Sequence, residues 1–208
     1  KLLKKKIIQS TPNIPLISEE TVNLNKKNEF KDFWLVDPID GTKDYINNKD
    51  EFTLNASLII NLEPTIGIIY APAKKRLFYS YGNGCSFEKF EQRKIQLECK
   101  KKIKLEEVHA VSNSSKPSSE VLKAHKKFNV KSFVNIRSSY KLCVIASGEF
   151  DLYAAKARAY EWDIAAGHAI VKHAGGIVTT LDEKEFKYGK EDYKNLSLLV
   201  RRSKDLKK

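Results

Sequence analysis

The sequence predicts a layered α/β protein in which helices alternate with sheets. In the first half of the chain, short apolar runs follow one another between turn signals, which is typical of strands. In the second half, strand-like and helix-like segments alternate, which favours layered packing of sheet and helix. A chain of 208 residues can bury one good core, or two small lobes that share a cleft.

The first half is expected to be mostly strands. Its apolar runs are short and bounded by Gly, Pro and Asn, and the link at residues 61–63 is short enough for a hairpin. The predicted elements, in order, are the end of a helix at 1–9, strands at 15–18 and 33–37, a short helix from Lys43 with Thr42 as its N-cap, paired strands at 52–60 and 64–71, and a strand at 76–81 that ends at the turn Gly82-Asn83-Gly84.

The second half is expected to alternate strictly. A charged, weakly patterned stretch at 88–104 separates it from the first half, so we predict two lobes, residues 1–95 and 105–208, within one overall domain. The predicted elements are strands at 108–112, 130–136, 150–155, 176–180 and 196–200, and helices at 118–128 with Ser118 as cap, 140–147 ended by Gly148, and 162–174 ended by Gly175-Gly176.

The composition excludes several classes of protein. No apolar run approaches membrane-spanning length, and the three Cys have no C-x-x-C spacing, which indicates reduced thiols in a cytoplasmic protein. The net charge of +12 suits anionic substrates and allows a weak peripheral association with the inner membrane. The Lys clusters are not interleaved with aromatic residues as a base-stacking surface would require, so no specific nucleic-acid binding is expected.

The segment at residues 37–42, Asp-Pro-Ile-Asp-Gly-Thr, carries the strongest functional signal. Pro38 disfavours helical geometry at Asp37, which therefore ends the preceding strand, and Asp40-Gly41 indicates a turn. Two carboxylates at a strand end can hold a hard cation such as Mg²⁺, and the free amides at a helix start can hold a phosphate. Taken alone, the same residues also fit a strand, a turn and a capped helix without chemistry.

Two other segments place acids in similar positions. Glu19 and Glu20 follow a short apolar strand, and Asp163 begins an Ala-rich helix. Alone, Glu19 fits a solvated loop acid and Asp163 fits a helix-start residue favoured by the helix dipole. Metal ions held close together need carboxylates from separate segments, at least one of them bridging. Glu19, Asp37, Asp40 and Asp163 would supply that set, with Asp37 as the bridge.

These three segments together resemble the inositol monophosphatase-like family of Mg²⁺-dependent phosphatases. That family carries a Glu-Glu pair, then D-P-[IL]-D-G-T, then W-D-x-A-A-G, and all three occur here in this order. One branch, the 3′(2′),5′-bisphosphate nucleotidases of CysQ type, is resembled more closely. The segments that carry this finer resemblance are 43–45 (Lys-Asp-Tyr), 51–55 (Glu-Phe-Thr-Leu-Asn), 67–72 (Gly-Ile-Ile-Tyr-Ala-Pro), 138–143 (Ser-Ser-Tyr-Lys-Leu-Cys) and 162–169 (Trp-Asp-Ile-Ala-Ala-Gly-His-Ala).

The resemblance implies a fold and a set of site residues. The fold would be of the inositol monophosphatase/fructose-1,6-bisphosphatase type, with the site between two lobes. By position, the metal ligands would be Glu19, Asp37, the carbonyl of Ile39, Asp40 and Asp163; the catalytic residues Thr42, which would orient the attacking water, and Asp40; and the substrate-binding residues Gly41, Thr42, Ser138, Lys141 and Asp163. Lys141 equally fits an ordinary solvated helix lysine.

The implied activity is hydrolysis of a phosphate monoester. The expected substrate is 3′-phosphoadenosine 5′-phosphate, converted to AMP and phosphate with Mg²⁺ as cofactor by a monomer or dimer in sulfur metabolism. The alternative is a broader phosphatase of the inositol monophosphatase type. Some nucleotidase positions differ, because Ser115 replaces a His, Ala155 replaces an Arg, and Arg137 replaces a small residue. We therefore expect weak nucleotide binding.

A second departure concerns the N-terminus. The family has a Thr and an Asp upstream of the Glu-Glu pair, on a segment for which the printed sequence, which starts at Lys1 and contains no Met, has no counterpart. The N-terminal element of the fold is thus expected to be missing, through a fragment, an unresolved segment or a lost 5′ end. A further alternative for the function is therefore an N-terminally truncated, inactive remnant.

Overall fold

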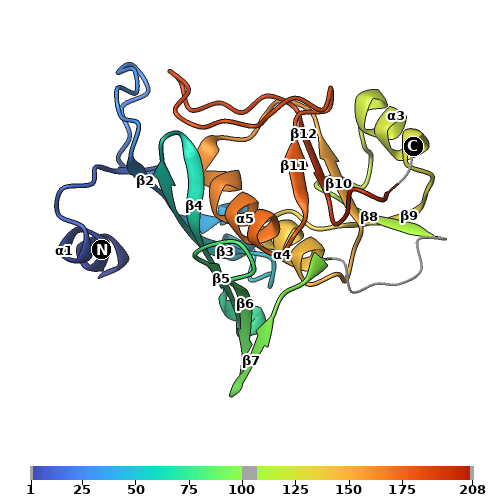
Figure 1. The fold of residues 1–208 in the computed structure, drawn as a ribbon, viewed down its shortest axis with the longest axis horizontal. Helices are drawn as coiled ribbons and strands as arrows, with labels where there is room; N and C mark the ends of the chain where they lie inside the picture. The colour runs from blue at the N-terminus through green and yellow to red at the C-terminus, as the bar shows by residue number, and fades with distance from the viewer. Residues whose placement is uncertain (1, 100–106, 207–208) are drawn as a thin grey trace.

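Two helices lie between a seven-stranded sheet and a five-stranded sheet in the computed structural model, which describes residues 2–99 and 107–206 (Figure 1). Helix α1 (Leu2–Ser10) covers the outer face of the larger sheet, and α3 (Ser119–Lys127) covers the outer face of the smaller one. The central layer consists of α4 (Tyr140–Ala146) and α5 (Glu161–His173). The predicted alternation of helix and sheet layers is confirmed.

The larger sheet comes from the first half of the chain and keeps its strands in sequence order. Strands β1 and β2 are parallel, and every later pair is antiparallel. Its strands are β1 (Leu16–Ser18), β2 (Phe33–Asp40), β3 (Thr53–Ile60), β4 (Glu63–Ala71), β5 (Arg76–Ser80), β6 (Ser86–Phe90) and β7 (Arg93–Gln96), with the short helix α2 (Thr42–Ile46) between β2 and β3 and a 3-10 turn (Pro72–Lys74) between β4 and β5.

Both faces of this sheet are covered at β2. Because successive side chains of a strand point to opposite faces, Phe33 and Leu35 join the central core beneath α5, whereas Trp34 and Val36 pack with Ile7 of α1. All four β2 side chains are buried. This two-sided burial explains why β2 begins as a continuous apolar run.

The smaller sheet comes from the second half and has the order β11-β12-β10-β8-β9. Strand β10 is parallel to β8, and β8 is parallel to β9, whereas β12 runs antiparallel to both of its neighbours. The bounds are β8 (Val108–Ser112), β9 (Val130–Asn135), β10 (Leu152–Ala155), β11 (Ile177–Thr179) and β12 (Leu198–Arg201).

Helix α5 is buried on nearly all sides, as a helix between two sheets must be. Two glycines allow its close approach to its neighbours. A Cβ on Gly67 of β4 would lie 2.2 Å from the backbone oxygen of Ala166, and a Cβ on Gly167 would lie 2.6 Å from Cβ of Leu142 in α4. The close packing of α5 against the larger sheet therefore depends on Gly67, and its close packing against α4 depends on Gly167.

Most predicted elements are present within one or two residues of their expected ends, but two expectations are wrong. No strand is predicted in the stretch 88–104, but it contains the end of β6 and all of β7. Thr42 is the first residue of α2 and Gly41 is its N-cap. The end of the predicted boundary stretch, at 100–104, lies outside the described residues, and the two lobes 1–95 and 105–208 stay a prediction.

Candidate active site

Asp37 and Asp40 lie together at the end of β2. Residues three apart on a regular strand face opposite sides of a sheet, but the pairing of β2 with β3 shifts register between these two positions. The irregularity includes Pro38, and Asp37 Oδ1 accepts a hydrogen bond from the Ile39 N–H at 3.0 Å. As a result, both carboxylates belong to one cluster, and the Asp37 residue is only 1% exposed.

Asp163 reaches the same cluster from the start of α5. Its side chain accepts a hydrogen bond from the Tyr160 N–H at 2.8 Å, which caps the helix and restrains the side chain. Carboxylate oxygens of Asp37, Asp40 and Asp163 lie within 4.8 Å of one another. The Asp163 carboxylate thus both caps α5 and belongs to the acidic cluster.

Glu19 approaches from β1, the parallel neighbour of β2. The Glu19 N–H donates to the Val36 carbonyl at 3.1 Å, which places Glu19 beside the end of β2. Its side chain is exposed, yet its hydrogen bond and charge both act on Asp37 and raise the pKa of that carboxyl. Glu19 therefore lies beside the cluster formed by the three aspartates.

The electrostatics of the cluster favour a cation. Burial, followed by the charges of Asp40, Glu19 and Asp163, raises the pKa of Asp37 from 3.8 to about 9. Burial, followed by the charge of Asp40, raises the pKa of Asp163 to about 7. Carboxylate oxygens from three segments are the donor set that a hard divalent cation prefers, and such a cation would offset their mutual repulsion. The residues present therefore fit a metal of the Mg²⁺ type.

Ile39, Gly41 and Thr42 flank Asp40 where β2 turns into α2. Gly41 has φ +86°, and a Cβ there would lie 2.7 Å from the Glu51 carbonyl oxygen, so this position requires glycine. The Thr42 hydroxyl donates to the Ile39 carbonyl at 2.9 Å. The Asp44 and Tyr45 amides of α2 donate to the Gly41 carbonyl at 2.8 and 3.0 Å, whereas the first amides of a helix have no carbonyl of a preceding turn to bond.

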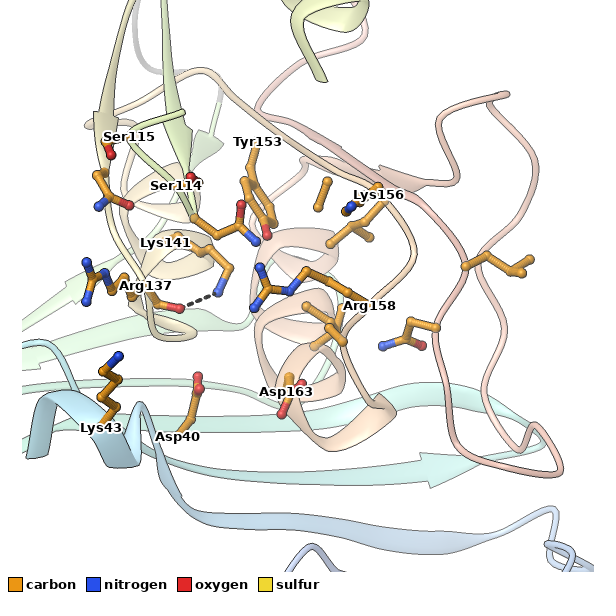
Figure 2. A pocket seen from close by; sticks show the side chains of 18 residues that line it. Asp40, Lys43, Ser114, Ser115, Arg137, Lys141, Tyr153, Lys156, Arg158 and Asp163 are labelled. Carbon is orange, nitrogen blue, oxygen red and sulfur yellow. Dashed lines mark hydrogen bonds between the residues drawn. The ribbon is translucent and has the colours of Figure 1, made fainter. Parts of the chain in front are cut away.

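A pocket of about 440 Å³ opens above Asp40 and Asp163, as Figure 2 shows. Lys141 lies in it and is 5% exposed, so the alternative of a solvated helix lysine is wrong. Its ammonium donates to the Ser138 carbonyl at 2.8 Å and to the Arg137 carbonyl at 3.2 Å. Burial lowers the pKa of Lys141, although Asp40 and Asp163 oppose that shift.

The pocket is rich in positive charge. Figure 2 shows the Arg158 guanidinium pointing into it between Lys141 and Asp163. The Ser115 and Ala155 positions also line it, so the residues that depart from the nucleotidase pattern do face this space. The cationic side chains that line the pocket are Lys43, Arg137, Lys141, Lys156 and Arg158.

Sequence reasoning missed two residues here. They are Ser139 and Arg158. Ser138 is fully buried, and its hydroxyl accepts a hydrogen bond from the Tyr140 N–H at 3.4 Å, whereas the next residue, Ser139, contacts Asp40. Arg158 carries no motif of its own. Their only local signals, the helix-start position of Ser139 and the cationic loop that leads to Asp163, do not by themselves indicate a site. The roles predicted for Ser138 and the other substrate residues stay predictions.

Comparison with known proteins agrees with this geometry. The model of the inositol monophosphatase family matches residues 1–207. The 3′(2′),5′-bisphosphate nucleotidase CysQ of Buchnera aphidicola is 38% identical over 184 residues, which is 86% of this chain and 67% of that protein. The enzyme of the same name from Salmonella typhimurium is 33% identical over 86% of this chain and 71% of its own length.

Solved structures show the same fold. CysQ from Bacteroides thetaiotaomicron, a bacterial member of the inositol monophosphatase family, superposes with a TM-score of 0.81 at 28% identity, over 94% of this chain and 79% of that one. Staphylococcal inositol monophosphatase I, in complex with products, has a TM-score of 0.77 at 20% identity, over 97% of this chain and 73% of that one.

Proposed function

Because the chain belongs to the inositol monophosphatase family of metal-dependent phosphatases, we propose that it is a Mg²⁺-dependent 3′(2′),5′-bisphosphate nucleotidase. Its substrate would be 3′-phosphoadenosine 5′-phosphate, hydrolysed to AMP and phosphate. One observation carries the proposal: two members of the acidic cluster, Asp40 and Asp163, line a pocket whose other charged side chains are cationic. The acids suit a metal, and the cations suit a substrate with more than one phosphate.

In this proposal, Mg²⁺ would be held by Asp37 as the central ligand, together with Glu19, the Ile39 carbonyl, Asp40 and Asp163. When bound, the metal would neutralise phosphate charge, lower the pKa of a water molecule and stabilise the leaving oxygen. Three of these residues, Asp37, Asp40 and Asp163, already lie with carboxylate oxygens within 4.8 Å of one another. Such preorganisation avoids reordering during the reaction.

Thr42 and Gly41 would orient the reacting groups. The amides of Gly41 and Thr42 donate to the phosphate oxygens at the start of α2. The Thr42 hydroxyl already donates its proton to the Ile39 carbonyl, so its free lone pairs can accept a hydrogen bond from the attacking water. That acceptor would align the water with the phosphorus.

The second phosphate would bind among the cations above the acidic cluster. Arg158 and Lys141 point toward the same space, and Arg137 and Lys156 border it. Guanidinium groups bind phosphate through paired hydrogen bonds, so Arg158 is a suitable partner for a second anionic group even though Ala155 supplies none. We expect this interaction to favour a nucleoside bisphosphate over a monophosphate.

The test is phosphate release from 3′-phosphoadenosine 5′-phosphate and from inositol monophosphate at equal concentrations, with and without Mg²⁺. The proposal predicts Mg²⁺-dependent release that is faster from the nucleotide. Faster release from inositol monophosphate would move the assignment to the broader phosphatase. No release from either substrate, with Mg²⁺ bound, would favour the inactive remnant.

We further expect a cytoplasmic enzyme, monomeric or dimeric, with a small phosphorylated molecule as its partner and at most a weak association with the membrane surface. No helix among the described residues is long and apolar enough to cross a bilayer.

A further inference from the structure

Ser139 is a fully buried serine that contacts both segments that carry the three clustered aspartates, β2 and α5. It is the residue before α4, and its hydroxyl oxygen lies 2.5 Å from Asp40 Oδ2 and 2.6 Å from the backbone oxygen of Asp163. Its backbone N–H also donates to Asp40 Oδ2, at 2.5 Å. A single residue thus connects the end of β2 with the first turn of α5.

The backbone N–H and the hydroxyl of Ser139 both have hydrogen-bond partners. Its hydroxyl has one proton to donate, and Asn55 Nδ2 donates to its oxygen at 2.9 Å. The backbone N–H of Ser139 donates to Asp40 whichever acceptor the hydroxyl proton takes. The hydroxyl can therefore donate to Asp40 or to the Asp163 carbonyl, and Asp40 keeps a hydrogen bond from Ser139 in both cases. Asn55 is the register partner of Asp37, so the same network also reaches the strand position of the third acid.

These contacts act against the electrostatic repulsion between the clustered aspartates. Asp37 and Asp40 come from β2, whereas Asp163 comes from a helix more than a hundred residues later, and their carboxylate oxygens lie within 4.8 Å of one another. Like charges at that separation repel, and nothing in the local sequence of either segment keeps them together. A tie between the two segments must therefore come from elsewhere in the fold.

We propose that Ser139 is a positioning residue that holds Asp40 and the start of α5 at the spacing required for divalent-cation binding. This inference rests on the metal site of the proposed function. Ser139 does not itself bind the cation or the substrate; it acts through Asp40 and Asp163. Partners of this kind, which hold metal ligands in place, typically contribute a factor of about 10–100 to metal affinity.

The test is the dissociation constant of Mg²⁺ alone, measured by isothermal titration calorimetry on Ser139→Ala, on the wild type and on a matched control. The control is Ser86→Ala, because Ser86 is also fully buried and its hydroxyl also donates to an α5 carbonyl, that of Ile170, at 3.0 Å. We expect Ser139→Ala to bind Mg²⁺ about 10–100-fold more weakly and Ser86→Ala to bind it like the wild type.

The Mg²⁺ dependence of turnover provides a second test of the same variants. A positioning role predicts that Ser139→Ala needs more Mg²⁺ for half-maximal turnover but recovers most of its kcat when Mg²⁺ is saturating. If Ser139→Ala fails to fold, Ser139→Cys keeps the volume and removes the strong hydroxyl donor, and the same loss of Mg²⁺ affinity is expected.

The outcomes separate this inference from the proposed function. Equal Mg²⁺ affinity in wild type and folded Ser139 variants overturns the positioning role, whatever the substrate proves to be. An equal loss of affinity in Ser86→Ala also overturns it, because the effect would then be general. Weaker Mg²⁺ binding by Ser139→Ala alone supports it, even if the wild type does not hydrolyse the nucleotide.

Discussion

At the scale of single residues, the site depends on charges placed where water cannot easily reach them. Asp37 is almost completely buried beside other acids, and Lys141 is buried a short distance above them. Buried charges of one sign are costly unless an opposite charge joins them. The aspartates therefore indicate a cation, and the lysine and arginines of the pocket indicate an anion next to it.

Arg158→Ala should weaken substrate binding selectively. We expect KM for 3′-phosphoadenosine 5′-phosphate to rise by about 10-fold or more, because a charge-assisted hydrogen bond contributes about 1.5–3 kcal/mol. KM for inositol monophosphate, which has one phosphate, should change little. Steady-state kinetics with both substrates measures the difference.

The matched control for Arg158 is Arg93→Ala, which removes the same charge from β7, at an exposed position on the edge strand of the larger sheet. It should leave both KM values unchanged. An equal rise of KM for the two substrates in Arg158→Ala would show that Arg158 does not recognise a second phosphate.

The sequence predicted the acids better than the groups around them. Asp37, Asp40 and Asp163 lie in motifs whose spacing carries a chemical meaning, and the structure brings these three together. Ser139 and Arg158 could not be found in this way, because their importance comes from contacts between segments distant in sequence. A serine at a helix start and an arginine in a loop have the same local pattern whether or not they face a site.

At the scale of elements, the site depends on how closely α5 packs. The helix carries Asp163, and its approach to β4 and α4 requires a missing side chain at Gly67 and at Gly167. The expected ends of α5 and of most strands could be predicted from apolar patterning and turn residues. Strand β7 could not, because its four residues are all exposed and have no apolar face to produce a pattern.

Gly67→Ala should destabilise the protein more than Gly167→Ala. At Gly67 the new Cβ would meet the backbone oxygen of Ala166 at 2.2 Å, which can move only if α5 moves, whereas at Gly167 it would meet the side chain of Leu142. Overpacking of this kind costs about 1–3 kcal/mol, and we expect Gly67→Ala at the upper end of that range. Urea unfolding of both variants measures the order, and the reverse order would contradict this account of the contact.

At the scale of the whole molecule, the chain combines a net charge of +12 with an acidic cluster at its centre. The raised pKa of Asp37 links this cluster to global stability. Between its ordinary pKa of 3.8 and its folded value of about 9, the folded state holds a proton that the unfolded state has released. Stability of the metal-free protein must therefore fall as the pH rises through this interval.

Thermal unfolding in the presence of a chelator should show this fall in melting temperature from acidic to alkaline pH. The melting temperature of Asp37→Asn should depend less on pH, because asparagine cannot ionise. Part of the pH dependence should remain, since the pKa of Asp163 is raised to about 7. Adding Mg²⁺ should stabilise the wild type more at high pH than at low pH, since metal binding displaces protons. A melting temperature that rises with pH without metal would contradict this linkage.

The claim on which the rest depends is that Asp37 stands at the centre of a divalent-cation site. The most direct measurement is calorimetric titration of Mg²⁺ into wild type and Asp37→Asn, with Asp182→Asn as a control that removes an acid remote from the cluster, paired with Lys184. We predict that Asp37→Asn stays folded but loses more than about 100-fold in Mg²⁺ affinity, while Asp182→Asn binds like the wild type. A folded Asp37→Asn that retains near-native Mg²⁺ affinity would contradict the assignment of this cluster as a metal centre.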